Sequence, residues 1–484
     1  MRVFISLLIL CFSMGLKAQL FVNPGGVVGM QQGSIVTVQT MDMENFGDIS
    51  HAGDLEVTGN IINSGLWACS PSNKSRVSLT LDWTNTSFFN PGIGRVEFNG
   101  TNQNIGGTVE TRFNNLVLRG TSGNQKTLLI NSQCLDSLYL TDVELATNGN
   151  RFTLRNASVI IQRNSGYIST LNNGVVRAIF PVALNTNREI PLGFGTLAAN
   201  YKPLYLVAAS QDSFDMTLFG NSPDFDGRSS TALQDSLCSI NDNYYYRIQT
   251  YGNPIFYGMR RSAAELQFTK LARWNGLVWD KIPGSGPTSF IPVQNLAFNS
   301  QLSSLTEFVT QAKERPYVNA GPDIGLLPGS KKQFNPTGYF PIGSTFLWDP
   351  GLDLSCTDCL DPTFTMGTPG IYTIKVSNGP NCEAVDSLRI FQIGNYSDLI
   401  ANAFSPNGDR LNDEFGPKLF PGDQLVSLEI YNRWGEMLYS GTQSWDGTYL
   451  GTPVQEGAYL YKLFIKGPSE GRHFYLSGSV TVVR

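Results

Sequence analysis

The stretch ENFGDISHAGDLEVTGNIINSGLW, residues 44–67, decides the fold expected for the N-terminal part of this 484-residue chain. Glycine occupies every sixth position in it, at Gly47, Gly53, Gly59 and Gly65, and apolar residues stand between the glycines. A six-residue step of short strand and tight turn suits a β-solenoid, because each coil must turn corners while it points aliphatic side chains inward. The stretch therefore predicts a β-solenoid.

Apolar alternation continues downstream, from Val96 and Phe98 to residues 159–161, and no segment keeps helical spacing for long. We therefore expect the solenoid to cover residues 19–178. The segments VEFNGT (96–101) and FNNLVL (113–118) resemble the parallel β-helices common in Bacteroidetes surface proteins. A β-sandwich rich in Asn and Gly is the alternative, although a six-residue step would not arise naturally from it.

The start of the chain has the layout of a secretory signal peptide over residues 1–18. Arg2 precedes an apolar run at 3–12, and small residues follow at 15–18. The run is too short to cross a bilayer, and no later stretch offers the roughly 18 uncharged apolar residues of a membrane span. We therefore expect a secreted protein without a transmembrane anchor.

Size and composition favour several β domains. At roughly 150 residues per domain, 484 residues suggest three or four. The mild net charge of -5 and the lack of a basic patch argue against nucleic acid as a partner. Only 15% of residues are charged and 49 are glycine, which favours short strands joined by tight turns. We therefore expect an all-β protein.

Two further domains are expected after the solenoid. Near Ala178 the six-residue step ends and aromatic content rises, which predicts a β-sandwich at 179–312 that caps the last coil. Residues 313–394, with a central Trp348 and alternating strands, resemble an immunoglobulin-like domain of the PKD type. Such modules are spacers more often than binders.

The last domain, residues 395–484, carries four separated motifs in a fixed order: NAFSPNGD, NRWG, WDG and EGAYLY. Their key residues are Pro406, Asn407, Gly408, Asp409, Asn432, Arg433, Trp434, Gly435, Trp445, Asp446, Gly447, Gly457 and Tyr459. This stretch resembles the gliding motility-associated C-terminal domain, the type B sorting domain of the type IX secretion system in Bacteroidetes. The resemblance implies that the C-terminus is an export address read by the outer-membrane machinery. It also implies that the protein is released or attached at the outer-membrane surface.

The cysteines give a partial disulfide framework. Cys356 and Cys359 would form a metal knuckle only with a second pair, and none follows at a usable spacing. In the PKD-like modules that this region resembles, such a pair bonds to itself, and a second bridge joins the position of Leu327 to that of Cys382. The resemblance therefore implies that Cys382 lacks its usual partner. Buried thiols are expected at Cys69, Cys134 and Cys238.

Composition argues against a histidine-based catalytic triad or a multi-histidine zinc site. His51 and His473 are the only two histidines, and we expect both at the surface, in a turn and in a loop. No Gly-x-Ser-x-Gly, P-loop or His-Glu-x-x-His motif occurs. Asp136, Asp142 and Glu144 could line one face of a coil and serve a carboxylate enzyme, but residues that solvate turns are the simpler interpretation.

The first motif of the last domain is also a candidate calcium loop. Asn407, Asp409 and Asp413 alternate oxygen ligands in a turn, as calcium prefers. Asn and Asp also satisfy turn backbones unaided, and Arg410 adds a positive charge, so both interpretations stay open. Trp434 and Trp445 are expected in the core of the domain rather than as platforms for sugars.

These observations predict a secreted cell-surface structural or adhesive protein, not an enzyme, whose solenoid is a stalk or a contact surface. Its expected partners are the type IX machinery and surface glycans or other surface proteins. A part in gliding motility is a further candidate. The rival is a polysaccharide-active β-helix lyase or glycosidase, which clustered Asp, Glu, Arg and Lys on one stacked face would support. A groove lined with Asn, Ser and Thr would support adhesion.

Overall fold

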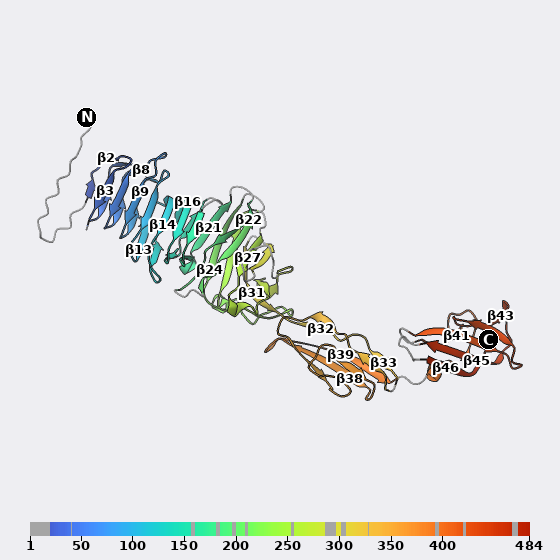
Figure 1. Ribbon diagram of the computed structural model, residues 1–484. Helices are drawn as coiled ribbons and strands as arrows, with labels where there is room; N and C mark the ends of the chain where they lie inside the picture. The colour runs from blue at the N-terminus through green and yellow to red at the C-terminus, as the bar shows by residue number, and fades with distance from the viewer. Residues whose placement is uncertain are drawn as a thin grey trace. The chain divides into compact units, whose positions relative to one another are not determined.

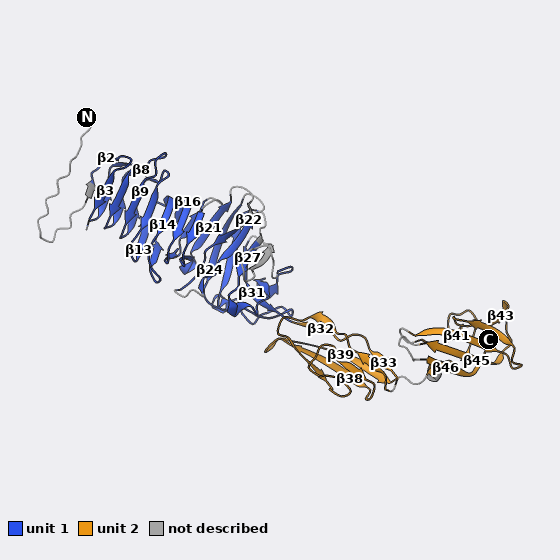
Figure 2. Cartoon of the chain, viewed as in Figure 1, with its two compact units in different colours: residues 1–315 blue, residues 316–484 orange. Residues whose placement is uncertain are grey.

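The computed structural model divides into two compact units, residues 1–315 and 316–484 (Figure 2). It describes residues 20–39, 41–155, 160–180, 184–195, 200–208, 212–252, 256–285, 297–301, 306–327, 329–392, 396–419, 423–466 and 473–484. Within these ranges the regular elements are strands and short 3-10 helices, which confirms the all-β prediction. The predicted signal peptide, residues 1–18, lies outside the described residues. Among the described residues, no helix is long and apolar enough to span a bilayer.

The first unit begins with a solenoid of three stacked parallel sheets, as the sequence predicts (Figure 1). The first sheet contains β1 (Leu20–Val22), β4 (Met43–Asn45), β7 (Ile61–Asn63), β10 (Trp83–Asn85), β13 (Gln103–Gly107), β15 (Gln125–Leu128), β17 (Glu144–Ala146) and β20 (Tyr167–Ser169). The second contains β2 (Val27–Met30), β5 (Asp48–His51), β8 (Leu66–Cys69) and β11 (Phe89–Asn90). The solenoid part of the third contains β3 (Ile35–Val38), β6 (Asp54–Val57), β9 (Arg76–Leu79), β12 (Arg95–Phe98), β14 (Thr111–Leu118), β16 (Ser132–Leu140), β18 (Arg151–Leu154) and β21 (Val175–Phe180), with β19 (Ile160–Arg163) beside β16.

The six-residue step arises because three such steps make one coil. Met43 pairs with Ile61, one coil further on, and the hydrogen-bonded side chains of Asn45 and Asn63 are 18 positions apart. A Cβ atom on Gly65 would meet the carbonyl oxygen of Gly47 well inside the 3.0 Å that real Cβ atoms keep. Successive coils therefore approach so closely at these corners that only glycine fits.

A ladder of buried amides lines one corner of the solenoid. Asn45 donates through Nδ2 to Oδ1 of Asn63 at 2.8 Å, and Asn63 donates in the same way to Asn85 at 2.8 Å. All three side chains are buried. Each amide is thus satisfied by its neighbours in the stack, which removes the free-energy penalty of burying it unpaired.

His51 lies inside the solenoid, so the expectation of a surface histidine is wrong. Strand β5 alternates exposed and buried residues, and this alternation turns His51 inward with Ile49. The His51 ring lies 6.0 Å from that of the buried Trp67. Burial lowers the pKa of His51 to about 4, because a charged imidazolium would lose its hydration there. His473 is exposed, and it begins the last strand instead of lying in the preceding loop.

The third sheet runs on from the solenoid into an antiparallel region without a break. Strand β21 pairs antiparallel with β24, so the last coil leaves no open edge on this sheet. The added strands are β24 (Asp212–Phe219), β26 (Tyr245–Thr250), β31 (Thr306–Glu314), β28 (Lys270–Trp274) and β29 (Trp279–Lys281), with β25 (Leu237–Ile240) on β31. A second sheet contains β22 (Leu184–Ile190), β23 (Leu204–Ala208), β27 (Phe256–Arg260) and β30 (Ala297–Gln301). One hydrophobic core extends from Val22 to Val309.

Short 3-10 helices connect some of these strands. They are η1 (Leu171–Asn173), η3 (Pro223–Asp226) and η4 (Ala263–Glu265). Ser222 accepts a hydrogen bond from the backbone N–H of Asp224 and so caps η3.

The second unit begins with a small β-sandwich built around Trp348. Its strands are β32 (Tyr317–Asn319), β33 (Ile324–Leu326), β34 (Lys331–Gln333), β35 (Thr337–Tyr339), β36 (Thr345–Asp349), β37 (Thr363–Thr365), β38 (Gly370–Ser377) and β39 (Glu383–Gln392). The buried Trp348 ring lies 5.1 Å from that of Phe334, which in turn packs against Phe364 and Tyr372. The sandwich therefore has its own aromatic core.

The disulfides correct part of the cysteine framework. Cys356 and Cys359 are joined by a disulfide, with their Cα atoms 5.9 Å apart. Cys382 is not unpaired, because it is disulfide-bonded, and so is Cys238, which was expected to be a buried thiol. The expectation for Cys382 failed because it considered only one partner position, Leu327. Free buried thiols are found at Cys69 and Cys134, as expected.

The last β-sandwich has a separate core. It consists of η5 (Tyr396–Leu399), β40 (Ala403–Phe404), β41 (Gln424–Tyr431), β42 (Met437–Gly441), β43 (Thr448–Tyr449), β44 (Thr452–Pro453), β45 (Gly457–Lys466) and β46 (His473–Val482). The five-stranded sheet has the order β40-β46-β45-β41-β42, and β40 and β46 pair in parallel. Phe404, Phe415 and Trp445 fill the core between the strands.

Candidate functional site

The first sorting motif forms a loop after β40 that is held by the carboxylate of Asp413. This carboxylate accepts hydrogen bonds from the backbone N–H groups of Asn407 (3.0 Å), Gly408 (2.7 Å) and Arg410 (2.7 Å). The N–H of Gly408 is the main reason that the pKa of Asp413 lies below its usual value. Asp409 likewise accepts from the N–H of Leu411 at 2.8 Å.

These bonds bear on the candidate calcium site. Both carboxylate oxygens of Asp413 already face N–H donors, and Asp409 and Asn407 are linked through their own side chains. A calcium ligand set needs six to eight oxygens that face the ion instead. Within the described residues, no group of three or more His, Cys, Asp or Glu side chains could hold a metal ion. The oxygens of this loop therefore fit a hydrogen-bonded turn better than a calcium site.

The second motif is a tight turn between β41 and β42 that presents Trp434 to solvent. The Oδ1 atom of Asn432 accepts from the N–H of Trp434 at 2.9 Å and from that of Glu436 at 3.0 Å. Gly435 completes the turn with a φ of 83°. Trp434 is 85% exposed, so its expected place in the core is wrong. The fixed turn points it outward, and the core is already filled by other rings.

Trp445 of the third motif is one of those core rings. It is fully buried, its Nε1 donates to the carbonyl of Thr448 at 2.8 Å, and its ring lies 5.5 Å from those of Phe404 and Tyr459. Asp446 caps its own turn by accepting from the N–H of Thr448 at 3.0 Å. The two tryptophans of the sorting motifs therefore have opposite roles.

The folded domain brings the separated motifs together. A pocket of about 360 Å³ joins the second and fourth motifs and is lined in part by Asn432, Arg433, Trp434, Glu456, Gly457 and Tyr459. A Cβ atom on Gly447 of the third motif would lie 2.9 Å from the ring of Pro406 of the first. The C-terminal Arg484 donates through its N–H to Glu456 at 2.8 Å and through its guanidinium to the carbonyl of Gly447 at 3.1 Å. The four motifs therefore lie close together in the folded domain, where they contribute to its pocket and to its hydrophobic core.

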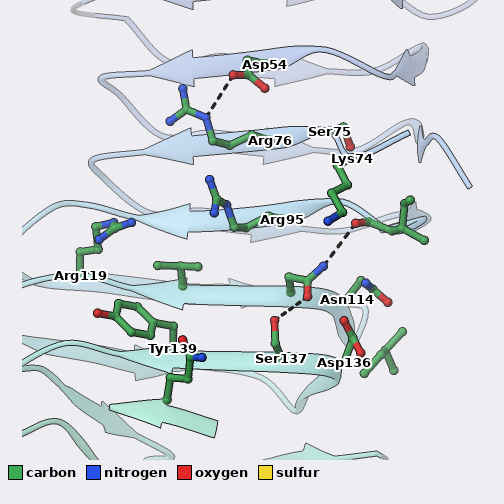
Figure 3. Close-up of a pocket in the computed structure, with 15 residues that line it drawn as sticks. Asp54, Lys74, Ser75, Arg76, Arg95, Asn114, Arg119, Asp136, Ser137 and Tyr139 are labelled. Atoms are coloured by element: carbon green, nitrogen blue, oxygen red, sulfur yellow. Dashed lines mark hydrogen bonds and ion pairs between the residues drawn. The ribbon is translucent and has the colours of Figure 1, made fainter. Parts of the chain in front are cut away.

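A second candidate site is an open groove on the outer face of the third sheet of the solenoid (Figure 3). Its volume is about 1080 Å³. Because side chains alternate along a strand, every second residue of β9, β12, β14 and β16 points to the outer face of the sheet, where the groove lies. The parallel register stacks these residues in a first row, Arg76, Arg95, Asn115 and Ser137. A second row contains Ser78, Glu97, Val117 and Tyr139.

Ion pairs occupy the end of the groove near β6. Arg76 binds Asp54 at 3.3 Å and also binds Glu56. Glu97 is almost completely buried beneath three arginines, with Arg95 at 2.7 Å, Arg76 at 3.7 Å and Arg119 at 3.9 Å. The acids at this end are therefore engaged by guanidinium groups.

The other end of the groove is polar and includes the exposed carboxylate of Asp136. Asn115 donates through Nδ2 to the carbonyl of Gly94 at 3.2 Å and accepts a hydrogen bond from Ser137. Tyr139 follows in the second row, with the guanidinium of Arg119 5.9 Å from its ring centroid. This floor offers fixed hydrogen-bonding groups beside an aromatic ring.

The three acids that the sequence analysis considered for catalysis do not converge. Asp136 lies at the groove, on β16. Asp142 follows β16 and binds the Ser165 hydroxyl at 2.6 Å, which keeps its pKa below the usual value. Glu144 belongs to β17 in the first sheet and accepts from the hydroxyl of Ser169. The basic residues of the groove, by contrast, gave no signal in the sequence, because they stand about 20 positions apart.

Comparison with known proteins identifies the last domain. The CHU_C type IX secretion signal domain matches residues 399–482, which include all four sorting motifs. No curated protein matches the chain.

Three solved structures illustrate the structural matches. Titin domains z1z2 in complex with telethonin match with 17% identity over 35% of this chain and 93% of that chain, at a TM-score of 0.12. Dimeric latent PorU from Porphyromonas gingivalis matches with 14% identity over 61% of this chain and 35% of that chain, at a TM-score of 0.14. The BSP domain of a biofilm associated protein matches with 11% identity over 60% of this chain and 76% of that chain, at a TM-score of 0.14. These scores are too low to support an argument from any of the three. The match at 399–482 therefore establishes a C-terminal sorting domain, which marks the chain for export to the cell surface or the extracellular space.

Proposed function

We propose that this chain is a structural or adhesive protein of the cell surface. The match of residues 399–482 to a type IX secretion signal domain carries the proposal, since it supplies export and leaves the solenoid as the part that acts outside. The open groove on the solenoid gives that part a polar contact surface. Surface glycans or other surface proteins are its partners.

The remaining domains have supporting roles in this proposal. Residues 313–394 serve as a spacer of the immunoglobulin-like PKD type, which agrees with their compact sandwich around Trp348. Gliding motility is linked to this chain through the resemblance of residues 395–484 to the gliding motility-associated C-terminal domain, whereas the matched family model describes a type IX secretion signal. Adhesion is therefore the preferred role.

We also propose that the chain is not an enzyme. A clustering of Arg, Asp and Glu on one stacked face would support a lyase or glycosidase, and the β6 end of the groove has such a cluster. Its acids Asp54, Glu56 and Glu97, however, are each within ion-pair distance of an arginine. A glycosidase needs two carboxyl groups that flank the scissile bond and are available to it. The Asn115 and Ser137 floor favours binding over turnover.

The exposed turn at Trp434 is proposed as the contact with the secretion machinery. Its indole is not needed for the core, yet the turn is held rigidly by Asn432. Large exposed aromatic rings beside a pocket are typical of interaction sites, because they lose unfavourable hydration on contact. The export domain would thus be recognised as a folded surface.

An attachment assay tests the adhesive function. Cells without this chain should attach less well to a polysaccharide-coated surface, and the full chain should restore attachment. A chain without residues 20–315 keeps the sorting domain, so it should be exported but fail to restore attachment. Full restoration by this shortened chain would reject the proposed role of the solenoid.

A further inference from the structure

We propose that the groove on the third sheet of the solenoid binds an anionic polysaccharide through Lys74, Arg95 and Arg119, with Tyr139 and the Asn115 and Ser137 floor beneath the sugar chain. The inference names the ligand class for the adhesive role proposed above and rests on that role. It concerns the groove alone and does not depend on how the chain is exported.

The direction of the groove suits an extended polymer. The groove crosses the stacked strands from β6 to β16, and neighbouring strands lie about 4.8 Å apart, so these five strands span about 19 Å. Equivalent positions recur at each strand because the register is parallel. A linear chain laid along the groove would cross the strands in turn and would meet Arg76, Arg95, Asn115 and Ser137 in that order.

Glu97 differs in exposure from the arginines above it. Glu97 has a side chain that is only 5% exposed, whereas those of Arg95 and Arg119 are 48% and 47% exposed. The buried carboxylate therefore lies beneath the two guanidinium groups and holds them in place without presenting its own charge. A ligand in the middle of the groove meets two exposed guanidinium groups that the protein has positioned in advance.

Lys74 adds a third cation, and Figure 3 shows it across the groove from Arg95. In the part of the chain that the structure describes, no carboxylate lies within ion-pair distance of Lys74. Asp54 and Glu56, at the β6 end, are engaged by Arg76. The exposed Lys74 and the two half-exposed guanidinium groups therefore favour a ligand that carries carboxylate or sulfate groups, because such a ligand would form ion pairs here that a neutral sugar would not.

The floor supplies the contacts expected for the sugar rings themselves. Asn115 is oriented by the carbonyl of Gly94 and by Ser137, so its amide is fixed before a ligand arrives. Tyr139 is half-buried and offers an apolar ring at the same level.

Binding of defined polymers to the purified full chain tests the proposal. We expect calorimetry to show binding of polygalacturonate or of dextran sulfate, and weaker or no binding of neutral dextran. The first polymer carries carboxylates and the second sulfates, so their ranking identifies the anionic group. Equal binding of neutral dextran, or tighter binding of single-stranded DNA, would overturn the assignment.

Matched variants localise the binding. Lys74→Gln and Arg119→Gln should each weaken binding of the preferred polymer about tenfold, as expected for loss of a hydrogen bond to a charged group. Lys331→Gln removes an exposed lysine on β34, outside the groove, and should bind like the parent chain. All three should keep the parent melting temperature, because the replaced side chains are exposed.

Unchanged binding by both groove variants would reject the groove as the site. If this happened while cell attachment still required residues 20–315, the adhesive function would stand and the anionic-polysaccharide inference would fall. The two proposals are thus tested separately.

Discussion

His51 and Cys69 lie side by side inside the solenoid, and their surroundings keep both uncharged at neutral pH. The Sγ atom of Cys69 is 3.8 Å from Nδ1 of His51. Burial raises the pKa of Cys69 to about 11 and lowers that of His51 to about 4. A thiolate next to an imidazolium, which a reactive cysteine requires, is therefore not favoured. The pair contributes to packing.

Acid should destabilise the solenoid through His51. The folded state holds His51 at a pKa of about 4 and the unfolded state near 6.5, so the unfolded state binds the proton first. The contribution of neutral His51 to the free energy of unfolding is fully present above pH 6.5. It is lost as the pH falls towards 4, and the total loss is about 3 kcal/mol. Thermal unfolding of the parent chain and of His51→Gln at pH 7 and 4.5 measures it.

The variant should lose less stability than the parent between these two pH values. His473→Gln, at an exposed position, should behave like the parent. An identical pH dependence for His51→Gln and the parent would show that His51 does not titrate in this range.

Close approach of coils makes two glycines of the solenoid respond differently to substitution. Gly65→Ala would place a Cβ atom against the backbone of Gly47 and should cost about 1–3 kcal/mol or more through overpacking. Gly29→Ala has nothing within 4 Å and should change stability by less than about 0.5 kcal/mol. Urea unfolding of both variants compares them, and equal stabilities would contradict the account of the corners.

At the scale of elements, the sorting domain places one tryptophan of its motifs in the hydrophobic core and the other on an exposed turn. Trp445 packs against Phe404 and Tyr459, whereas Trp434 extends from the turn between β41 and β42. The sequence alone could not separate the two residues, because both stand in short Gly-containing motifs and a small domain usually buries its tryptophans. In the structure, Trp434 is the one that turns outward, on a turn held by the hydrogen bonds of Asn432.

Substitution of the two tryptophans should therefore give opposite phenotypes. Trp445→Ala should cost about 3–5 kcal/mol and unfold much of the domain. Trp434→Ala should change stability by less than about 0.5 kcal/mol yet reduce export. Tyr475→Ala, at a 76% exposed position of β46, is the control that should export normally. Normal export of Trp434→Ala would remove this turn from the recognition surface.

The loop at Asp413 should keep its structure without calcium. Its carboxylate already accepts three backbone N–H groups, so chelation with EDTA should leave the melting temperature of the domain unchanged. Asp413→Ala removes these acceptors and should lower it. A rise in melting temperature on calcium addition, abolished by Asp413→Ala, would restore the calcium interpretation.

At the scale of the whole molecule, the sequence predicted the solenoid but not how it continues. The six-residue spacing of glycines is visible between Gly47 and Gly65 because the coils there are 18 residues long. The spacing fades where the coils become longer, since the stacked amides of Asn63 and Asn85 lie 22 positions apart in the sequence. The shared sheet through β21 and β24 left no trace, because parallel and antiparallel strands have the same alternation. The groove could not be predicted from the sequence for a related reason: the register between strands brings together residues that are distant in the sequence.

The separate cores make the C-terminal domain dispensable for folding. The solenoid with its antiparallel region and the sandwich around Trp348 each have their own hydrophobic core, distinct from that of the last domain. A chain without residues 395–484 should therefore fold but lack its export address. Cell fractionation after production of the full and the shortened chain measures this most directly. The account predicts the full chain at the surface or in the medium and the shortened chain in the periplasm, and a shortened chain that still reaches the surface would contradict it.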